Sequence, residues 1–240
     1  MNPQVSIILR CRNNWQLTKS CIDSIKKTTD TSLYRLILVD DGSIDETFDE
    51  VKKKPTTAEP EFIYLRHEES MGAIVATNYG IDYVLKNPTP YILILDNDTE
   101  ILEGNESWLN DMIKYFEDDE AVGMVGAVSD NVSGLQHVSQ LTNDKKSKFL
   151  ISFCMMMSLK CVKKVGMMDE LFSPMSGEDL DYSIRATRNG FKLKVAKDVF
   201  IKHHCHQTLN QNWDLNELTQ RNERKLLAKW GERIYYGIRQ

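Results

Sequence analysis

Two aspartates separated by one position follow an apolar run in the stretch YILILDNDTEI, residues 91–101. Asp96 and Asp98 repel each other and cannot be buried cheaply, so we expect a positive partner to meet them. Carboxylates suit a hard divalent cation such as Mg2+ or Mn2+, which often bridges protein and phosphate oxygens. The alternative is that both aspartates are turn residues facing water, because turns favour Asp and Asn.

A second acidic group lies in the stretch GEDLDYSIRATRN, residues 177–189. Glu178 or Asp179 could take the proton of an attacking hydroxyl, as a general base does. Asp181 precedes Arg185 by four residues, a spacing that favours an ion pair along a helix. The alternative is an acidic first turn that complements the helix dipole.

The stretch KHHCHQT, residues 202–208, contains three histidines: His203, His204 and His206. Alternation along an extended chain would place His204 and His206 on one face and His203 on the other. Any of the three could join the aspartates at a metal ion. A separate zinc site of His204, Cys205 and His206 is the alternative, although no second pair of ligands stands nearby in sequence.

A regular alternation of strands and helices positions the acidic residues. Apolar runs and helical spacing predict strands at 5–11, 34–43 and 61–67, a fourth strand beginning at residue 91, and helices at 14–29, 45–54 and 72–87. Nearly continuous apolar strands of this kind indicate an α/β fold with a mainly parallel sheet covered by helices on both faces. Ligands then bind at the carboxyl ends of the strands, where Asp40 and Asp41 would converge with Asp96 and Asp98.

The alternation is looser after residue 104. We expect a helix near 107–118, a strand near 122–128, a polar stretch at 129–148, an apolar run at 149–159, a helix at 178–189, strands within 191–204 and a helical segment at 209–236. The last segment is rich in Leu and Trp. It could pack on the rest of the chain, form a dimer contact or touch a membrane surface.

Composition limits the possible functions. The chain has 240 residues and a formal net charge of -5, which argues against a surface that grips nucleic acid as a whole. No apolar run approaches the roughly 18 to 20 residues that span a bilayer, and the N-terminus lacks a signal-peptide pattern, so we expect a cytoplasmic protein. The five cysteines are scattered without a CxxC, as is typical of reduced thiols.

Five stretches in the same order resemble the family 2 glycosyltransferases of the GT-A fold. They are VSIILRCRNNWQLTKSCIDSI, LILVDDGSIDET, ESMGAIVATNYGI, YILILDNDTEI and VGMMDELFSPMSGEDLDYSIRATRNGFKL. The resemblance covers roughly residues 4–208. It implies a Rossmann-like catalytic domain at 1–208, with a nucleotide-sugar half at 1–104 and an acceptor half at 105–208, followed by a C-terminal helical extension at 209–240.

The resemblance also implies a reaction. It is the metal-dependent transfer of a hexose from a nucleoside diphosphate sugar, with UDP expected as the nucleotide, to an acceptor hydroxyl with inversion. Asp179 would be the general base and Glu178 its substitute. Asp98 would bind Mn2+ or Mg2+, with Asp96 near the ribose or a metal-bound water, and the family spacing to Thr208 selects His203 among the histidines. The nucleotide sugar would contact Arg10, Arg12, Asn13, Asp40, Asp41, Gly72, Asn78, Asp96 and Asn97.

One position departs from the family pattern, and two other functions compete. Arg12 stands where members often have an aromatic residue, so stacking on the base would come from a guanidinium plane or be absent. A nucleotidyltransferase would show a similar sheet but needs a glycine-rich phosphate loop, and residues 9–15 contain no glycine. A non-catalytic nucleotide-binding module has no need of Asp179. The acceptor could be a sugar, a lipid-linked glycan, a protein or another hydroxyl compound.

Overall fold

A computed structural model describes residues 3–53, 60–142, 146–204 and 214–239. Its main sheet has the strand order β3-β2-β1-β4-β7-β6-β8. These strands are β1 (Val5–Cys11), β2 (Tyr34–Asp41), β3 (Phe62–His67), β4 (Tyr91–Asp96), β6 (Val122–Val128), β7 (Cys154–Ser158) and β8 (Lys192–Phe200). Neighbouring strands are parallel except where β7 pairs with β4 and β6, so the expected mainly parallel sheet is confirmed.

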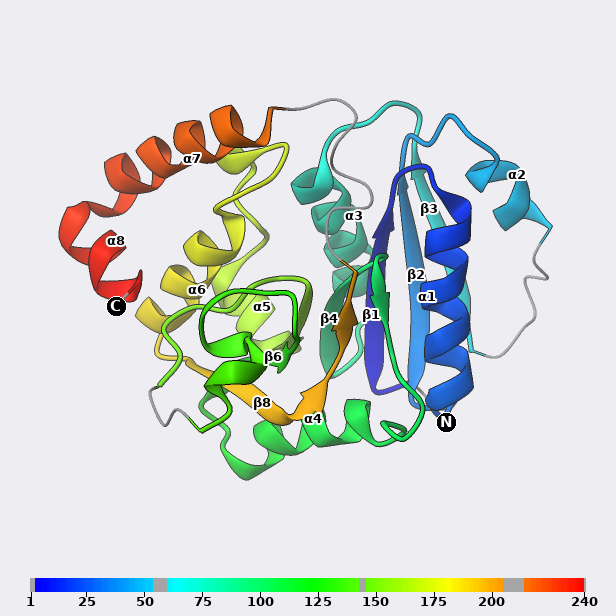
Figure 1. Cartoon of the computed structure of the whole chain (residues 1–240), viewed down its shortest axis with the longest axis horizontal. Helices are drawn as coiled ribbons and strands as arrows, with labels where there is room; N and C mark the ends of the chain where they lie inside the picture. The colour runs from blue at the N-terminus through cyan, green and yellow to red at the C-terminus, as the bar shows by residue number, and fades with distance from the viewer. Residues whose placement is uncertain (1–2, 54–59, 143–145, 205–213, 240) are drawn as a thin grey trace.

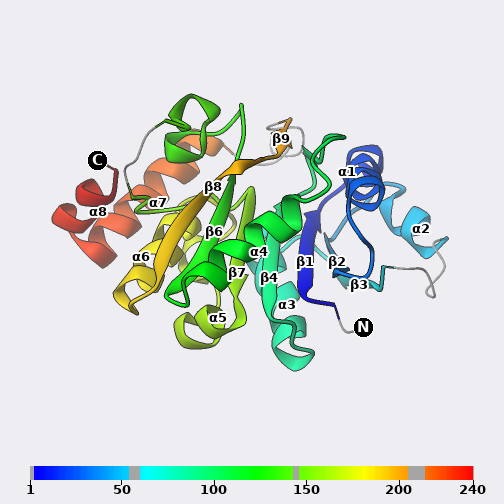
Figure 2. The same ribbon diagram turned by 90° about the horizontal axis from the view of Figure 1, so that it is seen from below.

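Helices cover both faces of this sheet, as Figures 1 and 2 show. They are α1 (Trp15–Thr28), α2 (Thr47–Lys52), α3 (Ala73–Lys86), α4 (Trp108–Asp118), α5 (Leu159–Val165), α6 (Glu178–Arg188), α7 (Leu215–Trp230) and α8 (Glu232–Arg239). One apolar cluster lies under α1 and α4, and a second lies under α3, α5, α6 and α7. Each strand of the centre buries side chains on both faces, which explains its continuous apolar sequence.

The described part of the expected C-terminal helical segment forms two helices, α7 and α8. Gly231 ends α7 with a φ of 77°, a left-handed conformation that glycine adopts without strain. Leu226 and Tyr235 are buried in the same cluster as residues of α3 and α6, so both C-terminal helices pack on the rest of the described chain. None of the helices in the described part of the chain has the length and apolar character that a bilayer-spanning helix requires.

A short ribbon completes the fold near the carboxyl ends of the strands. β5 (Thr99–Glu100) pairs antiparallel with β9 (Lys202–His203), and Thr99 is the register partner of His203. The two segments are about a hundred residues apart in sequence, so this pairing brings Lys202 and His203 close to the end of β4. The apolar run at 149–159 yields β7 and the start of α5, a helix that periodicity did not predict.

Candidate active site

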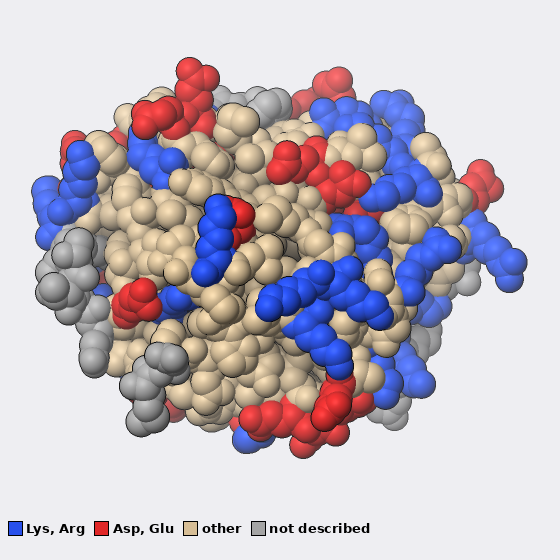
Figure 3. Space-filling view, turned by 180° about the vertical axis from the view of Figure 1, so that it is seen from behind, with Lys and Arg blue, Asp and Glu red and all other residues tan. Residues whose placement is uncertain are grey.

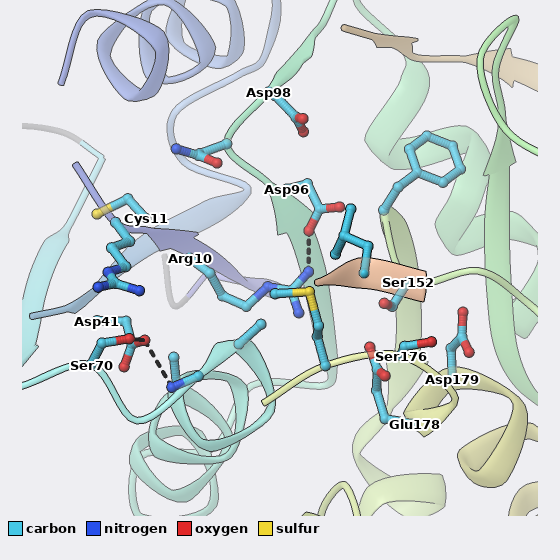
Figure 4. Close-up of a pocket in the computed structure, with 18 of the residues that line it drawn as sticks. Arg10, Cys11, Asp41, Ser70, Asp96, Asp98, Ser152, Ser176, Glu178 and Asp179 are labelled. Carbon is cyan, nitrogen blue, oxygen red and sulfur yellow. Dashed lines mark hydrogen bonds and ion pairs between the residues drawn. The ribbon is translucent and has the colours of Figure 1, made fainter. Parts of the chain in front are cut away.

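A cavity of about 820 Å3 opens where the strand order reverses, between β1 and β4. Arg10 at the end of β1 and Asp96 at the end of β4 are direct register partners there. Open parallel sheets bind ligands at such a switch point, because the loops leave it in opposite directions. Figure 4 shows the Asp96 and Asp98 carboxylates on one side of Arg10 and the Glu178 and Asp179 carboxylates on another.

The first group of side chains is an acidic cluster with one imidazole. One ligand atom each from Asp96, Asp98 and His203 lies within 4.8 Å of the others. His203 Nε2 is 3.2 Å from Asp98 Oδ1 and 4.0 Å from Asp96 Oδ2. Of the three candidate histidines, His203 is the one that the described structure brings to the aspartates.

Two neighbours fix the His203 ring. Its Nδ1 lies 3.2 Å from the backbone carbonyl oxygen of Asn131, which can only accept, so Nδ1 carries a hydrogen. The bond to Asp98 then needs a second hydrogen on Nε2, and a metal ion held here would take the place of that hydrogen. The Phe153 ring stacks on the imidazole with centroids 5.1 Å apart. Burial lowers the pKa of His203, but the bond to Asp98 and the charges of Asp98 and Asp96 outweigh it and raise the pKa above its ordinary value.

Arg10 is the positive partner that the sequence led us to expect. Its guanidinium donates to Asp96 Oδ1 and, at 3.1 Å, to the hydroxyl of Thr77. Burial lowers the pKa of Arg10, yet the charges of Asp96, Glu178 and Asp98 raise it overall, so the group is always cationic. For Asp96, burial raises the pKa and Arg10 opposes it, with a net raised value. One oxygen of Asp96 is thus held by Arg10 and the other faces the cluster.

The donor set fits a divalent cation. Two carboxylates and an imidazole converge from β4, its following turn and β9, and they leave one side of the cluster open to the cavity. Oxygen and imidazole ligands suit Mn2+ or Mg2+, whereas a structural zinc site would require four closed ligands. A cation would also relieve the mutual repulsion of Asp96 and Asp98, which His203 and Arg10 balance only in part.

The second group is the carboxyl pair at the start of α6. Burial raises the pKa of Glu178 to about 7, with a further rise from the charge of Asp179, and burial raises the pKa of Asp179 to about 6. Glu178 Oε2 is buried and has no hydrogen-bond partner among the described residues. A buried acceptor of this kind at a cavity wall is suited to a group brought by a ligand. Both residues line the cavity.

The two aspartates at the end of β2 have different surroundings. Asp41 lines the cavity, but its oxygens accept hydrogen bonds from the His67 ring, the Ser70 hydroxyl and the backbone N–H groups of Met71 and Gly72. Burial raises its pKa, and these four donors lower it overall. Asp41 therefore anchors the loop that enters α3.

Asp40 and Asn78 lie outside the cavity lining, against the expectation that they contact a nucleotide. Asp40 is fully buried and accepts from Ser43 N, the Tyr64 hydroxyl and Arg66. The amide of Asn78 joins α3 to the backbone of Met168 at 2.9 and 3.0 Å. Both side chains are bonded within the protein and hold loops, which their sequence positions alone did not reveal.

The other expected nucleotide contacts line the cavity: Arg10, Arg12, Asn13, Gly72, Asp96 and Asn97. Asn13 accepts from the backbone N–H of Ile44 at 2.9 Å, which joins the loops after β1 and β2. Gly72 has a φ of 95°, and a Cβ there would lie 2.6 Å from Pro174, so glycine is required. Asn97 donates to the Thr18 hydroxyl at 2.9 Å.

His204, the other candidate histidine in the described part of the chain, does not join the acidic cluster. His204 is exposed and its Nε2 is 3.0 Å from Glu100 Oε2, on the other side of the β5–β9 ribbon. It is therefore not a metal ligand with Asp96 and Asp98. His206, Cys205 and Thr208 lie outside the described residues, so the zinc alternative and the pairing of His203 with Thr208 stay predictions.

Sequence reasoning missed several residues of the site. Asn131 and Phe153 orient His203 from the least patterned part of the chain, and Asp45 lines the cavity beyond the DDGS turn. The first turns of α7 also contribute to the wall through Leu215, Asn216 and Thr219. Only Asp45 had a signal in the sequence, as a third carboxylate after β2; the others depend on tertiary packing.

Comparison with known proteins agrees with this site. The family described as "Glycosyl transferase family 2" matches residues 6–166, which include Arg10, Asp41, Asp96 and Asp98. The chain therefore belongs to glycosyl transferase family 2. The matched range ends before Glu178, Asp179 and His203. No curated protein matches the chain by sequence.

Solved structures share the fold at low identity. A mannosyltransferase from Pyrobaculum calidifontis in complex with GDP-Man and Mn2+ has a TM-score of 0.69 and 16% identity, over 86% of this chain and 58% of that one. GalNAc-T7 with UDP, GalNAc and Mn2+ has a TM-score of 0.75 and 14% identity, over 97% and 49%. S. aureus TarS, residues 1–349, has a TM-score of 0.64 and 16% identity, over 83% and 60%. The chain thus spans between about half and three fifths of these proteins.

Proposed function

We propose that the protein is a metal-dependent, inverting glycosyltransferase that moves a sugar from a nucleoside diphosphate sugar to an acceptor hydroxyl. One observation supports this most: a single cavity holds the Asp96, Asp98 and His203 cluster and, across Arg10, the buried pair Glu178 and Asp179. The two solved relatives with bound nucleotides and Mn2+ support the donor class. The alternatives, a nucleotidyltransferase or a non-catalytic binding module, agree less well with the family match. They also leave the raised pKa values of Glu178 and Asp179 without a use.

The donor lies along the ends of β1, β2 and β4 in this proposal. Asn13, Gly72 and Asn97 line that wall, and Arg12 offers a guanidinium plane to a base. Since protein donors use both oxygens of Asp41, Asp45 is the carboxylate in this wall with capacity to accept from a base N–H, although one of its oxygens accepts from Thr47 N at 3.0 Å. A uracil N–H suits such an acceptor, so we propose a UDP-sugar.

A divalent cation held by Asp98, Asp96 and His203 would neutralise the diphosphate leaving group. Arg10 keeps Asp96 in place and adds positive charge beside the leaving group. Its link to Thr77 restrains the guanidinium, so the side chain need not reorganise during the reaction.

Asp179 takes the proton of the acceptor hydroxyl. Inversion requires the acceptor to attack from the face opposite the leaving group, and Glu178 and Asp179 lie away from Asp98 across the cavity (Figure 4). With a pKa of about 6, Asp179 is deprotonated at neutral pH and basic enough to accept a proton. The acceptor then sits against the remaining wall, which includes Ile151, Phe153, Met175, Leu215 and Thr219.

The experiment that tests this function is calorimetric titration of UDP, GDP, CDP and dTDP with and without Mn2+, followed by assay of nucleotide release from the matching sugars. We expect one nucleotide to bind only with the metal, because a cation held by Asp98, Asp96 and His203 would supply the positive charge that the diphosphate needs. Release of that nucleotide from its sugar should be accelerated. If no nucleotide binds under any metal condition, the donor site is wrong, and if binding occurs without turnover, the protein is a binding module.

A further inference from the structure

Helix α7 (Leu215–Trp230) is bonded to the segment that leads into the carboxyl pair. Arg221 donates to the carbonyl of Ser173, Lys225 to the carbonyl of Leu171 at 2.7 Å, and Lys229 to Asp169 Oδ2 at 2.6 Å. Figure 1 shows α7, in orange, beside the yellow segment that precedes α6. The C-terminal helix therefore does more than cover apolar surface.

The central contact is made by Asn222, which is fully buried. Its Nδ2 lies 2.7, 2.8 and 2.8 Å from the carbonyl oxygens of Phe172, Met175 and Ser176. The Nε of Arg221 donates to Asn222 Oδ1 at 3.1 Å, which fixes the side of the amide that faces the carbonyls. The two N–H groups of one amide are thus shared by three carbonyls, of which that of Phe172 is buried and those of Met175 and Ser176 are partly buried, and an alanine would leave all three without that donor.

The turn that Asn222 holds has an unfavourable backbone. Ser176 has a φ of 79° and Gly177 a φ of 91°, so a non-glycine residue occupies the left-handed region two positions before Glu178. A Cβ on Gly177 would lie 3.1 Å from Leu226 Cδ1 of α7. A turn with these dihedral angles persists only when its surroundings determine it, and α7 supplies the Asn222 and Leu226 contacts among those surroundings.

From these contacts we propose that Asn222 is a positioning residue, which holds the turn at 175–177 so that Glu178 and Asp179 face the cavity. The role in catalysis rests on the proposed function, in which Asp179 takes the acceptor proton. The first turns of the same helix line the cavity through Leu215, Asn216 and Thr219. Helix α7 therefore forms part of the cavity wall and also holds the turn that leads to Asp179, the proposed general base.

The test compares Asn222→Ala with Gln220→Ala, which removes an exposed amide from the same helix. For Asn222→Ala we expect faster hydrogen exchange at residues 175–180, an unchanged KM for the donor, and a kcat for nucleotide release from the donor sugar lowered by about 100-fold, since small misplacements of reacting groups have effects of this size. Loosening the turn also exposes the carboxyl pair, so the acid limb of the pH–rate profile should move to lower pH. Gln220→Ala should match the wild type in all four measurements.

A milder change guards against loss of folding. Arg221→Ala keeps the Asn222 side chain and removes the bond that orients it, so it should give smaller effects in the same directions. Unchanged exchange at 175–180, or donor affinity that falls as far as kcat in folded protein, would overturn the positioning role. Wild-type protein that binds nucleotides but turns over no donor would contradict the proposed function instead, while the exchange comparison still decides whether Asn222 holds the turn.

Discussion

At the scale of single residues, the site is governed by carboxylates in three electrostatic environments. Asp96 is held by a guanidinium, Asp41 by four neutral or weakly basic donors, and Glu178 by burial without a hydrogen-bond partner for Oε2 among the described residues. The pKa of the carboxyl group is therefore raised in Asp96 and Glu178 and lowered in Asp41, because solvation and local charge set it.

Asp98 is the residue on which metal binding should depend. Asp98→Ala removes the carboxylate 3.2 Å from His203 and leaves two of the three convergent ligands. We expect the Mn2+-dependent rise in Tm with nucleotide to disappear, because stabilisation by a ligand requires that the native state bind it. Thermal unfolding with and without Mn2+ measures this. The control is Asp82→Ala, which removes a surface partner of Lys86 and should keep the full Mn2+-dependent rise in Tm. If Asp98→Ala also shows the full rise, the proposed metal site is wrong.

Asp179 should control the rate and its pH dependence. Asp179→Asn should lower kcat by about 10^2 to 10^4-fold, the usual contribution of a general base, with little change in donor affinity. In the wild type, kcat/KM should fall as pH decreases below about 6, because the base becomes protonated there. Steady-state kinetics over a pH series test both statements. An unchanged rate in Asp179→Asn would transfer the role to Glu178.

Glu178 should reduce stability at high pH. Its folded pKa of about 7 exceeds the ordinary value of 4.5, so its favourable contribution is complete below about pH 4.5 and is lost as pH rises through 7. Glu178→Gln keeps the shape without the charge and should raise Tm at pH 8 by about 2–4 °C, the shift expected for on the order of 1 kcal/mol at this size. At pH 4.5 the wild type and Glu178→Gln should have the same Tm. A lower Tm for the variant at pH 8 would contradict the buried neutral form.

At the scale of elements, loops join strand ends to one another and to the helices. Asp41 at the end of β2 bonds the loop before α3, Asn13 after β1 bonds the loop after β2, and Asn131 after β6 bonds β9. These polar links run across the carboxyl edge of the sheet. The site is therefore positioned by bonds between loops as well as by the sheet register.

Asp41→Asn tests this arrangement. The NH2 group of the new asparagine would face a backbone N–H of Met71 or Gly72, and two donors cannot bond to each other. The variant should therefore have a free energy of unfolding lower by about 1–3 kcal/mol. Because the folded pKa of Asp41 is depressed, the loss should be seen at neutral pH and vanish as pH falls through that pKa. Urea denaturation at two pH values measures it. Asp30→Asn, which keeps an oxygen that can accept the exposed turn bond from the N–H of Ser32, should change little. Equal stability of Asp41→Asn and the wild type would contradict the anchoring role.

At the scale of the whole molecule, charge and packing are unevenly distributed. The net charge is -5, yet Lys and Arg side chains gather on the face seen in Figure 3, most densely toward its right side. The C-terminal helices share the apolar cluster of α3 and α6 instead of forming a core of their own. We therefore expect the described chain to unfold as one cooperative unit.

Leu226→Ala tests that cooperativity. Leu226 is 2% exposed and packs with α6 residues in one cluster, so the variant should lose about 2–5 kcal/mol of stability. Far-UV and near-UV circular dichroism should show a single shared transition in the wild type and the variant. Leu141→Ala makes the same change at a residue that is 41% exposed and should have little effect. A separate early transition of the C-terminal helices would contradict a single unit.

The sequence by itself determined the strand and helix order through β4, the strand β6, the helix α6 and the acidic residues that could do chemistry, because apolar periodicity and turn residues are local properties. It also carried the family resemblance. Only the tertiary structure showed that His203 meets the aspartates while His204 faces Glu100, that Asp40 and Asn78 lie outside the cavity lining, and that Asn131 and Asn222 make their contacts. These outcomes depend on pairing between segments remote in sequence and on burial, and both arise only when the chain packs.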